Sequence, residues 1–276
     1  MKIIPDLELV HILQYLMLGK EMYNPLISVI MPAYNAENTI RKSVLSVLNQ
    51  SYTNFELIIC DDGSTDETKK IILTFSDARI KFINNKYEKG AAGARNSAID
   101  ICSGEYVSFL DSDDIWASDK IEKQLSFMIK NDCDFSYGDY FTFKDDDNTG
   151  LFLAPVKTSY EDLLKTCSIG CLTVMLHKKL LINQRFPSGY KEDYQLWLRI
   201  LKDGIIAANY GSADSYYRLG KNTLSSNKID ELKKQWYVIR LQHVGYIKTV
   251  CYLLTYVYFG LKKHCQAYRS GLGVKI

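Results

Sequence analysis

Three carboxylates stand within four residues in the segment Asp111-Ser112-Asp113-Asp114. Carboxylates this close repel one another and raise one another's pKa unless a cation lies among them. A hard cation such as Mg²⁺ or Mn²⁺ relieves the repulsion, and it takes one or two protein carboxylates together with waters and ligand phosphates. A solvated turn in which Asp113 or Asp114 caps a helix beginning near Trp116 would also explain the segment. The alternatives are therefore a divalent-metal site and a helix cap.

Two further polar stretches contain residues that suit a nucleotide. In Asp61-Asp62-Gly63-Ser64-Thr65-Asp66 one carboxylate could accept a hydrogen bond from a base imide such as uracil N3–H, and Tyr34 could stack on that base. In residues 89–96, glycines and alanines allow a close backbone approach, and Arg95 suits a base or a phosphate at a helix start. A turn before a capped helix explains the first stretch equally well. A close helix–sheet contact explains the small residues of the second, but it does not account for Arg95.

The elements that must position these stretches alternate between strand and helix. The predicted strands are residues 26–31, 55–60, 80–83 and 106–110, and the predicted helices are residues 40–48, 67–75 and 91–101. This alternation predicts an α/β fold, a parallel sheet with helices on both faces. Because ligands bind at the carboxyl ends of such strands, residues 32–35, 61–64 and 111–114 should line one crevice. That position favours the metal site over the helix cap.

The rest of the chain is less regular. Residues 1–24 form an amphipathic extension that ends at Asn24-Pro25, and the second half contains a predicted strand at 169–176 and a predicted helix at 192–201. We expect this half to supply the other wall of the crevice.

The composition excludes several classes of protein. A chain of 276 residues with 47% hydrophobic residues is long enough for one large α/β domain with an appendage. The formal net charge of +2 argues against nucleic acid as a partner. The seven cysteines are scattered and include no Cys-x-x-Cys pair, so they predict buried thiols in a reducing compartment and no zinc site. The N-terminus lacks the features of a secretion signal, so we expect a cytoplasmic protein.

Taken together, four stretches resemble the inverting glycosyltransferases of family 2, which have the GT-A fold. The resemblance spans residues 26–225 and is carried by Ser28-Val29-Ile30-Met31-Pro32-Ala33-Tyr34-Asn35, Asp61-Asp62-Gly63-Ser64-Thr65-Asp66, Gly93-Ala94-Arg95-Asn96 and Phe109-Leu110-Asp111-Ser112-Asp113-Asp114. It implies a mostly parallel central sheet flanked by helices. The implied parts are an N-terminal extension (1–24), a catalytic domain (25–228) with a nucleotide-sugar half (25–115) and an acceptor half (116–228), and a C-terminal helical segment (229–276).

The resemblance also implies a donor site, with a UDP-sugar as the default donor. The side chains implied around the base are those of Pro32, Tyr34, Asp62 and Arg95. Asp111 would lie near the ribose, and Asp113 would be the direct ligand of Mn²⁺ or Mg²⁺, since it matches the last acid of the family's Asp-x-Asp motif. Ala33, Glu37 and Ser112 complete the implied donor-binding residues.

A general base is needed as well. Inversion by single displacement requires a carboxylate near the attacking hydroxyl, on the side opposite the leaving diphosphate. The segment Lys191-Glu192-Asp193-Tyr194-Gln195-Leu196-Trp197 resembles the family's Glu-Asp motif, which implies Asp193 as the base and Glu192 and Trp197 as acceptor-binding residues. Acids in the first turn of a helix are also ordinary dipole compensation. Arg218 and Lys221 could neutralise a diphosphate or be solvated loop residues.

The C-terminal segment raises the question of a membrane. Its uncharged run, Thr249 to Leu261, is shorter than the about 20 residues that span a bilayer. Basic residues flank it: Arg240, His243 and Lys248 before it, and Lys262, Lys263, His264 and Arg269 after it. Such a helix could lie in the interface of an anionic leaflet or pack as ordinary core. Members of the bacterial surface-polysaccharide branch (O-antigen, capsule, teichuronic acid) extend polyprenyl-diphosphate-linked glycans, which implies such an acceptor at the inner face of the inner membrane.

Other functions fit the sequence less well. A nucleotidyltransferase of similar fold would carry a Gly-rich, Arg-containing loop after the first strand, and residues 32–37 are unlike it. A processive synthase would carry a Gln-x-x-Arg-Trp motif, which residues 195–199 do not supply. A pseudo-transferase that only binds nucleotide-sugar would be expected to have lost Asp113 or Asp193, and both are present.

Overall fold

The N-terminal half contains the predicted parallel strands. The computed structural model describes residues 23–144, 147–220 and 228–267. Its first strands are β1 (Ile27–Ala33), β2 (Phe55–Asp61), β3 (Ile80–Asn84) and β4 (Tyr106–Phe109). They lie side by side in the order β3-β2-β1-β4, and all three pairs are parallel. Every residue of β1 and β2 is buried, as expected of strands covered on both faces.

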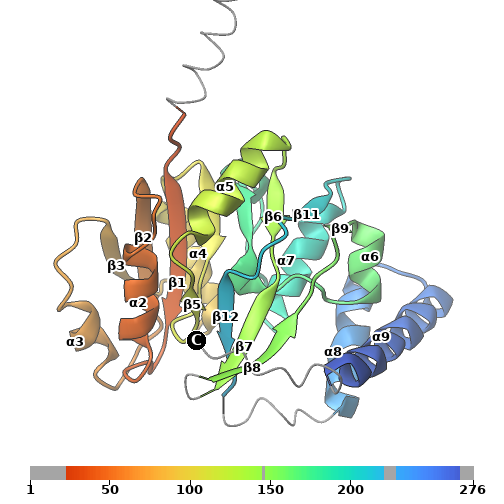
Figure 1. Cartoon of the computed structure of the whole chain (residues 1–276). Coiled ribbons are helices and arrows are strands. Elements are labelled where there is room, and N and C mark those ends of the chain that lie inside the picture. Colours follow the sequence, from red (N-terminus) through yellow and green to blue (C-terminus); the bar gives the residue numbers. More distant parts are fainter. Residues whose placement is uncertain (1–22, 145–146, 221–227, 268–276) are drawn as a thin grey trace, which may run out of the picture.

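Helices cover both faces of these strands (Figure 1). On one face α2 (Ile40–Leu48) packs its apolar side against Val29, Met31 and Leu57. On the other, α4 (Ala91–Ile101) packs Ala94 and Ala98 against Ile30 and Ile58. Successive side chains of a strand point to opposite faces, so β1 contributes to both layers of core. The predicted helix at 67–75 is shorter than expected, since α3 covers only Thr68–Ile72.

The second half completes the same sheet with strands of mixed direction. The sheet has the order β3-β2-β1-β4-β10-β6-β11-β9 in the described residues, and its added strands are β10 (Met175–His177), β6 (Phe135–Tyr137), β11 (Ala207–Asn209) and β9 (Lys157–Thr158). Strand β10 runs antiparallel to both β4 and β6. The predicted strand at 169–176 is mostly wrong, because residues Cys171–Thr173 form the 3₁₀ turn η1 and pairing starts only at Met175.

A second, smaller sheet lies beside the main one. Its strands are β5 (Ile115–Trp116), β12 (Ser215–Arg218), β7 (Tyr140–Lys144) and β8 (Asp147–Phe152), paired in that order. Nothing in the sequence patterns had predicted this sheet. The helix expected near Trp116 begins four residues later, as α5 (Lys120–Lys130), because Ile115 and Trp116 pair with β12 instead.

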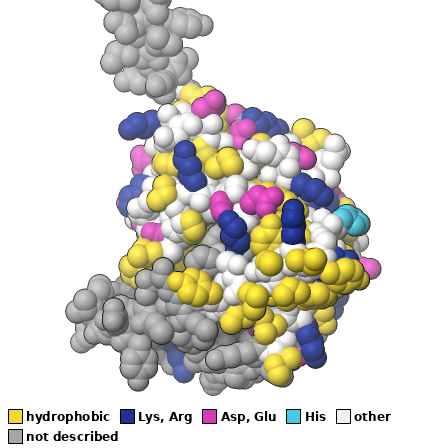
Figure 2. Space-filling model, turned by 90° about the vertical axis from the view of Figure 1, so that its right-hand side faces the viewer, with side chains coloured by type: hydrophobic (Ala, Val, Ile, Leu, Met, Phe, Trp, Pro, Cys, Tyr) yellow, Lys and Arg dark blue, Asp and Glu magenta, His cyan; other side chains and the backbone are white. Residues whose placement is uncertain are grey.

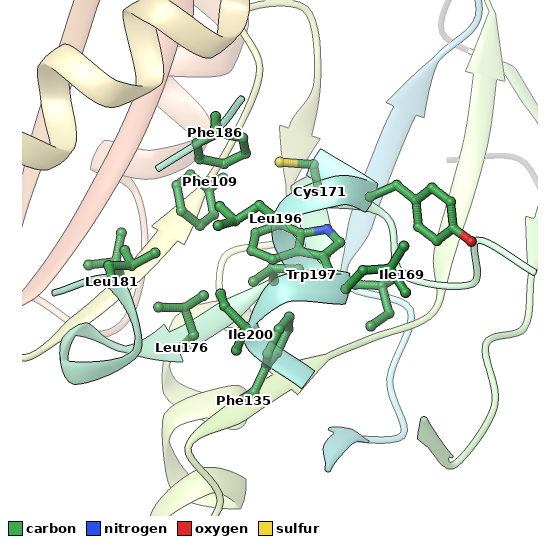
Figure 3. Packing of buried hydrophobic residues seen from close by; sticks show 14 of the residues in the cluster. Phe109, Phe135, Ile169, Cys171, Leu176, Leu181, Phe186, Leu196, Trp197 and Ile200 are labelled. Atoms are coloured by element: carbon green, nitrogen blue, oxygen red, sulfur yellow. The ribbon is translucent and has the colours of Figure 1, made fainter. Parts of the chain in front are cut away.

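The core of the second half is built around α7 (Glu192–Leu201), as Figure 3 shows. Trp197 is 0% exposed, and its ring centroid lies 5.2 Å from that of Phe135 and 5.8 Å from that of Phe186. On the outer side α6 (Tyr160–Lys165) covers this core, and 3₁₀ turn η2 (Lys178–Leu181) follows β10.

Two C-terminal helices, α8 (Lys228–Leu241) and α9 (Tyr246–Ala267), pack against each other, and α9 also contacts α6 (Figure 1). The Tyr252 hydroxyl donates to Glu161 of α6 at 2.7 Å. None of the helices in the described ranges is both long and apolar enough to cross a membrane.

Candidate active site

A cavity of about 700 Å³ opens at the carboxyl ends of β1 and β4. It brings together residues that the sequence separates by up to 188 positions, from Pro32 at the end of β1 to Gly220 after β12. We call it the donor cavity, and its walls include Pro32, Ala33, Tyr34, Asn35, Ala91, Asp111, Ser112, Asp113 and Arg218. The strand-end clusters at 32–35 and 111–114 thus lie together, as the expected parallel sheet requires.

Tyr34 presents an exposed ring at the edge of the donor cavity. The ring is 46% exposed, and the ammonium of Lys89 lies 4.3 Å from its centroid and 3.1 Å from its hydroxyl oxygen. A ring held in this way by a cation can receive the flat face of a base. Sequence reasoning gave Lys89 no role of its own.

Two predicted donor residues, Asp62 and Glu37, are not in the lining of the donor cavity. Asp62 is buried, and its carboxylate accepts from Asn85 Nδ2 at 2.6 Å and from the Gly90 amide at 2.8 Å. It therefore holds the loop that carries Lys89. The Glu37 side chain accepts from the Glu67 amide at 3.0 Å and braces the loop after β1 against the start of α3. Both side chains hold loops that lie next to the donor cavity.

The acidic segment is not a helix cap. The residue at the N-cap position of α5 is Asp119, so neither Asp113 nor Asp114 caps that helix. Asp113 is exposed at the donor cavity, and desolvation by the neighbouring walls together with repulsion from Asp111 raises its pKa. The raised pKa indicates a site that favours a positive charge.

Asp114 and Arg218 lock the acidic segment to the second sheet. Asp114 is 1% exposed, and its Oδ1 accepts from the Arg218 amide at 2.8 Å. Its Oδ2 is buried and has no hydrogen-bond partner among the described residues. The Arg218 side chain donates through Nε to the Asp113 carbonyl at 3.0 Å, which places a guanidinium at the donor cavity. Lys221, the other predicted diphosphate residue, lies outside the described residues.

A second cavity, of about 290 Å³, adjoins the first through Asp111, which lines both. We call it the acceptor cavity. Its polar wall is formed by Arg95, Asp111, Asp114, Glu192 and Asp193, and its remaining wall by Tyr140, Phe152, Cys167, Ser168, Ile169, Gly170, Cys171, Leu172 and Tyr217. The predicted general base and the predicted metal segment therefore face neighbouring cavities.

Arg95 lines the acceptor cavity and pairs with two of its carboxylates. It is 3% exposed, and its guanidinium donates to Asp111 Oδ1 at 2.6 Å and to Glu192 Oε1 at 2.9 Å. The expectation that Arg95 surrounds the base is not met, because the residue lines the acceptor cavity and not the donor cavity. Its placement instead fixes the end of β4 relative to the start of α7. A buried charge of this kind persists because both carboxylates compensate it.

Asp193 has the environment of a base. It lines the acceptor cavity, and burial together with repulsion from Glu192 raises its pKa to about 6. A carboxylate whose pKa is raised toward neutrality accepts a proton more readily and is still ionised near pH 7. Its Oδ1 accepts from the Tyr194 amide at 2.7 Å.

The prediction for Trp197 is wrong. Its side chain is fully buried in the core, in the same cluster as Ile169 and Cys171, and does not line the acceptor cavity. The aromatic residues that do line the cavity are Tyr140, Phe152 and Tyr217, which sequence reasoning missed. The alternating run Tyr140-Phe141-Thr142-Phe143 was the available signal for a strand there.

The chain is similar in sequence to bacterial glycosyltransferases. The family model of Glycosyl transferase family 2 matches residues 28–173. The chain is 51% identical over 247 residues to the Escherichia coli UDP-Glc:alpha-D-GlcNAc-diphosphoundecaprenol beta-1,3-glucosyltransferase WfgD, covering 89% of this chain and 98% of that protein. It is 40% identical to the putative teichuronic acid biosynthesis glycosyltransferase TuaG of Bacillus subtilis, covering 87% and 98% of the two chains.

Solved structures show the same fold. A mannosyltransferase from Pyrobaculum calidifontis, in complex with GDP-Man and Mn²⁺, superimposes with a TM-score of 0.64 at 17% identity, covering 88% of this chain and 76% of that one. S. aureus TarS 1-349 in complex with UDP-GlcNAc gives 0.63 at 20% identity, covering 77% and 65%. The expected GT-A fold is confirmed, and the chain belongs to glycosyl transferase family 2.

Proposed function

We propose that this protein transfers glucose, with inversion, from UDP-glucose to the GlcNAc residue of an undecaprenyl-diphosphate-linked acceptor. The observation that carries the proposal is Asp193, a carboxylate with a pKa of about 6 in a cavity that adjoins the donor cavity at Asp111. The choice of sugars rests on the likeness to the two E. coli glucosyltransferases named for this donor and acceptor, WfgD and WfaP, at 51% and 46% identity.

The two cavities would divide the reaction between them. The donor cavity would hold the nucleotide, with Tyr34 against the base and Arg218 near the diphosphate. The acceptor hydroxyl would sit in the acceptor cavity and lose its proton to Asp193. As its oxygen forms a bond to the anomeric carbon, the bond from that carbon to the diphosphate breaks and UDP leaves. Attack from the face opposite the diphosphate inverts the anomeric centre.

The residues present fit a hard divalent cation. The donor cavity carries the carboxylate oxygens of Asp111 and Asp113, and repulsion between the two raises the pKa of Asp113 after the larger effect of desolvation by the cavity walls. Asp113 would hold Mn²⁺ or Mg²⁺, and the donor's diphosphate would complete the coordination. When bound, the cation would neutralise charge on the leaving diphosphate. Asp114, with its unpaired Oδ2 buried behind the segment, would support the site.

Mass spectrometry of reaction products tests the proposal. Purified protein is incubated with Mn²⁺, a synthetic GlcNAc-diphosphate-lipid and, separately, UDP-glucose, UDP-galactose and UDP-GlcNAc. We expect addition of one hexose from UDP-glucose and a β linkage in the product. Retention of the anomeric configuration would contradict the mechanism, and transfer from another donor alone would correct the choice of sugar.

We also propose that the protein works as a peripheral protein at the inner face of the inner membrane, with α9 in contact with lipid. The exposed apolar residues of α9 recur on one side of the helix, within an arc of about 120° at 100° per residue. They are Tyr246 (68% exposed), Ile247 (83%), Val250 (47%), Leu254 (66%), Val257 (38%) and Tyr258 (61%). Figure 2 views the molecule from the side on which α6 and α9 lie and shows hydrophobic side chains gathered over the lower half of that face.

The opposite side of α9 packs on the protein, next to the acceptor cavity. The ring of Tyr256 lies 5.1 Å below the ammonium of Lys191, the residue before Glu192. In this proposal the packing expected for the segment occupies one side of α9, and the interfacial contact would occupy the other. The guanidinium of Arg240 lies 3.9 Å from the ring centroid of Tyr246, so a cation stands beside the apolar side and matches an anionic surface. The side chains of Lys262, Lys263, His264 and Arg269 lie outside the described residues.

Sedimentation with vesicles of anionic phospholipid tests this contact. We expect Leu254→Glu to reduce the bound fraction, because it puts a charge into the apolar side. Leu73→Glu is the matched control, since Leu73 is 65% exposed and follows α3 at the other end of the main sheet. Equal binding of both variants and the wild type would rule out α9 as the contact.

A further inference from the structure

One buried glutamine of α8 holds the residues on both sides of the catalytic pair Glu192-Asp193. The Gln235 side chain is 0% exposed. Its Oε1 accepts from the Lys191 ammonium at 3.1 Å, and its Nε2 donates to the Tyr194 hydroxyl at 2.8 Å. Because Lys191 and Tyr194 immediately flank the pair, a single amide spans the segment that carries the base.

Lys191 needs such support because of its backbone. It stands at the N-cap position of α7 with φ 54° and ψ 52°, a left-handed conformation that a non-glycine residue keeps only where its surroundings hold it. Besides Gln235, its ammonium contacts Glu231 Oε2 at 3.3 Å and lies over the ring of Tyr256. All three partners belong to α8 or α9. The turn that starts α7 is thus held from the C-terminal helices.

Tyr194, on the other side of the pair Glu192-Asp193, is also held by hydrogen bonds. It is 0% exposed, and its hydroxyl donates to the Leu163 carbonyl of α6 at 2.9 Å while it accepts from Gln235. Its backbone amide in turn donates to Asp193 Oδ1. A displacement of the Tyr194 ring would therefore move the amide that orients the base.

From these contacts we infer that Gln235 is a positioning residue for the sugar transfer, and that α8 and α9 are part of the catalytic apparatus and not an appendage. The inference rests on the proposed function, in which Asp193 takes the acceptor proton. Gln235 lines neither cavity, so it acts only through Lys191 and Tyr194. The C-terminal helices would thereby link the proposed lipid contact to the orientation of the base.

Steady-state kinetics of Gln235→Leu tests whether Gln235 positions the base or only stabilises the fold. Leucine keeps the volume of the side chain but removes both hydrogen bonds, so we expect kcat to fall about 10- to 100-fold while the Kd for UDP stays within about twofold of wild type. Gln235→Glu keeps the acceptor for Lys191 but loses the donor to the Tyr194 hydroxyl, whose own proton goes to Leu163, so its rate should lie between those of Gln235→Leu and the wild type. Lys233→Ala is the control, because Lys233 is an exposed residue of the same helix.

Hydrogen exchange gives a second readout that needs no substrate. Gln235→Leu should speed exchange of the amides at 191–195 and leave those of β1 unchanged. If Gln235→Leu does not fold, Lys191→Met replaces it, since this change removes the ammonium and leaves α8 intact. The inference is overturned by unchanged kcat and exchange, or by a loss of UDP binding that parallels the loss of rate. A wild type that transfers no sugar contradicts the proposed function instead, and exchange alone then decides on the positioning.

Discussion

The two cavities are built in different ways. The donor cavity is formed largely by short segments that follow β1 and β4, and its shape follows from the parallel sheet. The acceptor cavity takes its walls from α4, the segment after β4, the second sheet, the loop before β10 and α7. The first is local to each strand end, whereas the second depends on contacts between distant parts of the chain.

Their charges differ as well. Cationic groups stand at the edges of the donor cavity, where Lys89 lies over Tyr34 and Arg218 lies beside the acidic segment. The acceptor cavity contains carboxylates around one buried guanidinium, that of Arg95, whose contacts go to Asp111 and Glu192. An excess of buried negative charge raises carboxylate pKa values, so the acceptor cavity suits a base. The donor cavity, where Asp111 and Asp113 stand beside Arg218, suits an anionic ligand that arrives with a cation.

Asp193→Asn should impair the proton transfer in the acceptor cavity and leave nucleotide binding in the donor cavity intact. Asparagine keeps the size of the side chain but accepts no proton, so we expect kcat to fall by about 10²- to 10⁴-fold. Binding of UDP, measured by calorimetry, should stay as in the wild type because Asp193 does not line the donor cavity. A variant that retains the wild-type rate would remove Asp193 from the role of base.

Asp113→Ala should impair metal-dependent binding of the nucleotide in the donor cavity. Loss of the proposed metal ligand should lower kcat/KM by about 100-fold or more and weaken the dependence of UDP binding on Mn²⁺. Chelation of the metal in the wild type should abolish transfer, and added Mn²⁺ should restore it. The control is Asp119→Ala, because Asp119 is a partly exposed acid at the start of α5, paired with Lys123. Similar losses in both variants would argue against a specific metal ligand.

The pH profile of kcat/KM should report the pKa of Asp193 in the acceptor cavity. The raised pKa of Asp193 means that the carboxylate is ionised above pH 6 and protonated below it. The rate should therefore be constant above about pH 7 and fall about tenfold per unit of pH below about 6. A fall that begins only near the pKa of an ordinary aspartate, about 4, would show that the acceptor cavity does not perturb its base.

The same contrast explains what the sequence could predict. The position of Asp111 and Asp113 at the crevice could be predicted because a strand end is visible as an apolar run followed by acids. The placement of Arg95 could not be predicted from the sequence. Its partner Glu192 lies 97 positions later in the chain, and the two residues meet only because the second half of the chain folds against the first. Tyr140 and Tyr217 were missed for the same reason: they meet through the pairing of β7 with β12, which no local pattern encodes.

Tyr34→Leu should have the smallest effect on the kinetics, and it tests whether the two cavities bind their substrates separately. Leucine removes the ring proposed to stack on the base, so the KM for the donor should rise about 2- to 10-fold with the KM for the acceptor unchanged. Tyr34→Phe is the matched variant, because it keeps the ring and loses only the hydroxyl bond to Lys89. We expect its donor KM to stay close to wild type. An equal rise in both variants would assign the effect to the contact with Lys89, and a rise in the acceptor KM would show that the two cavities do not act separately.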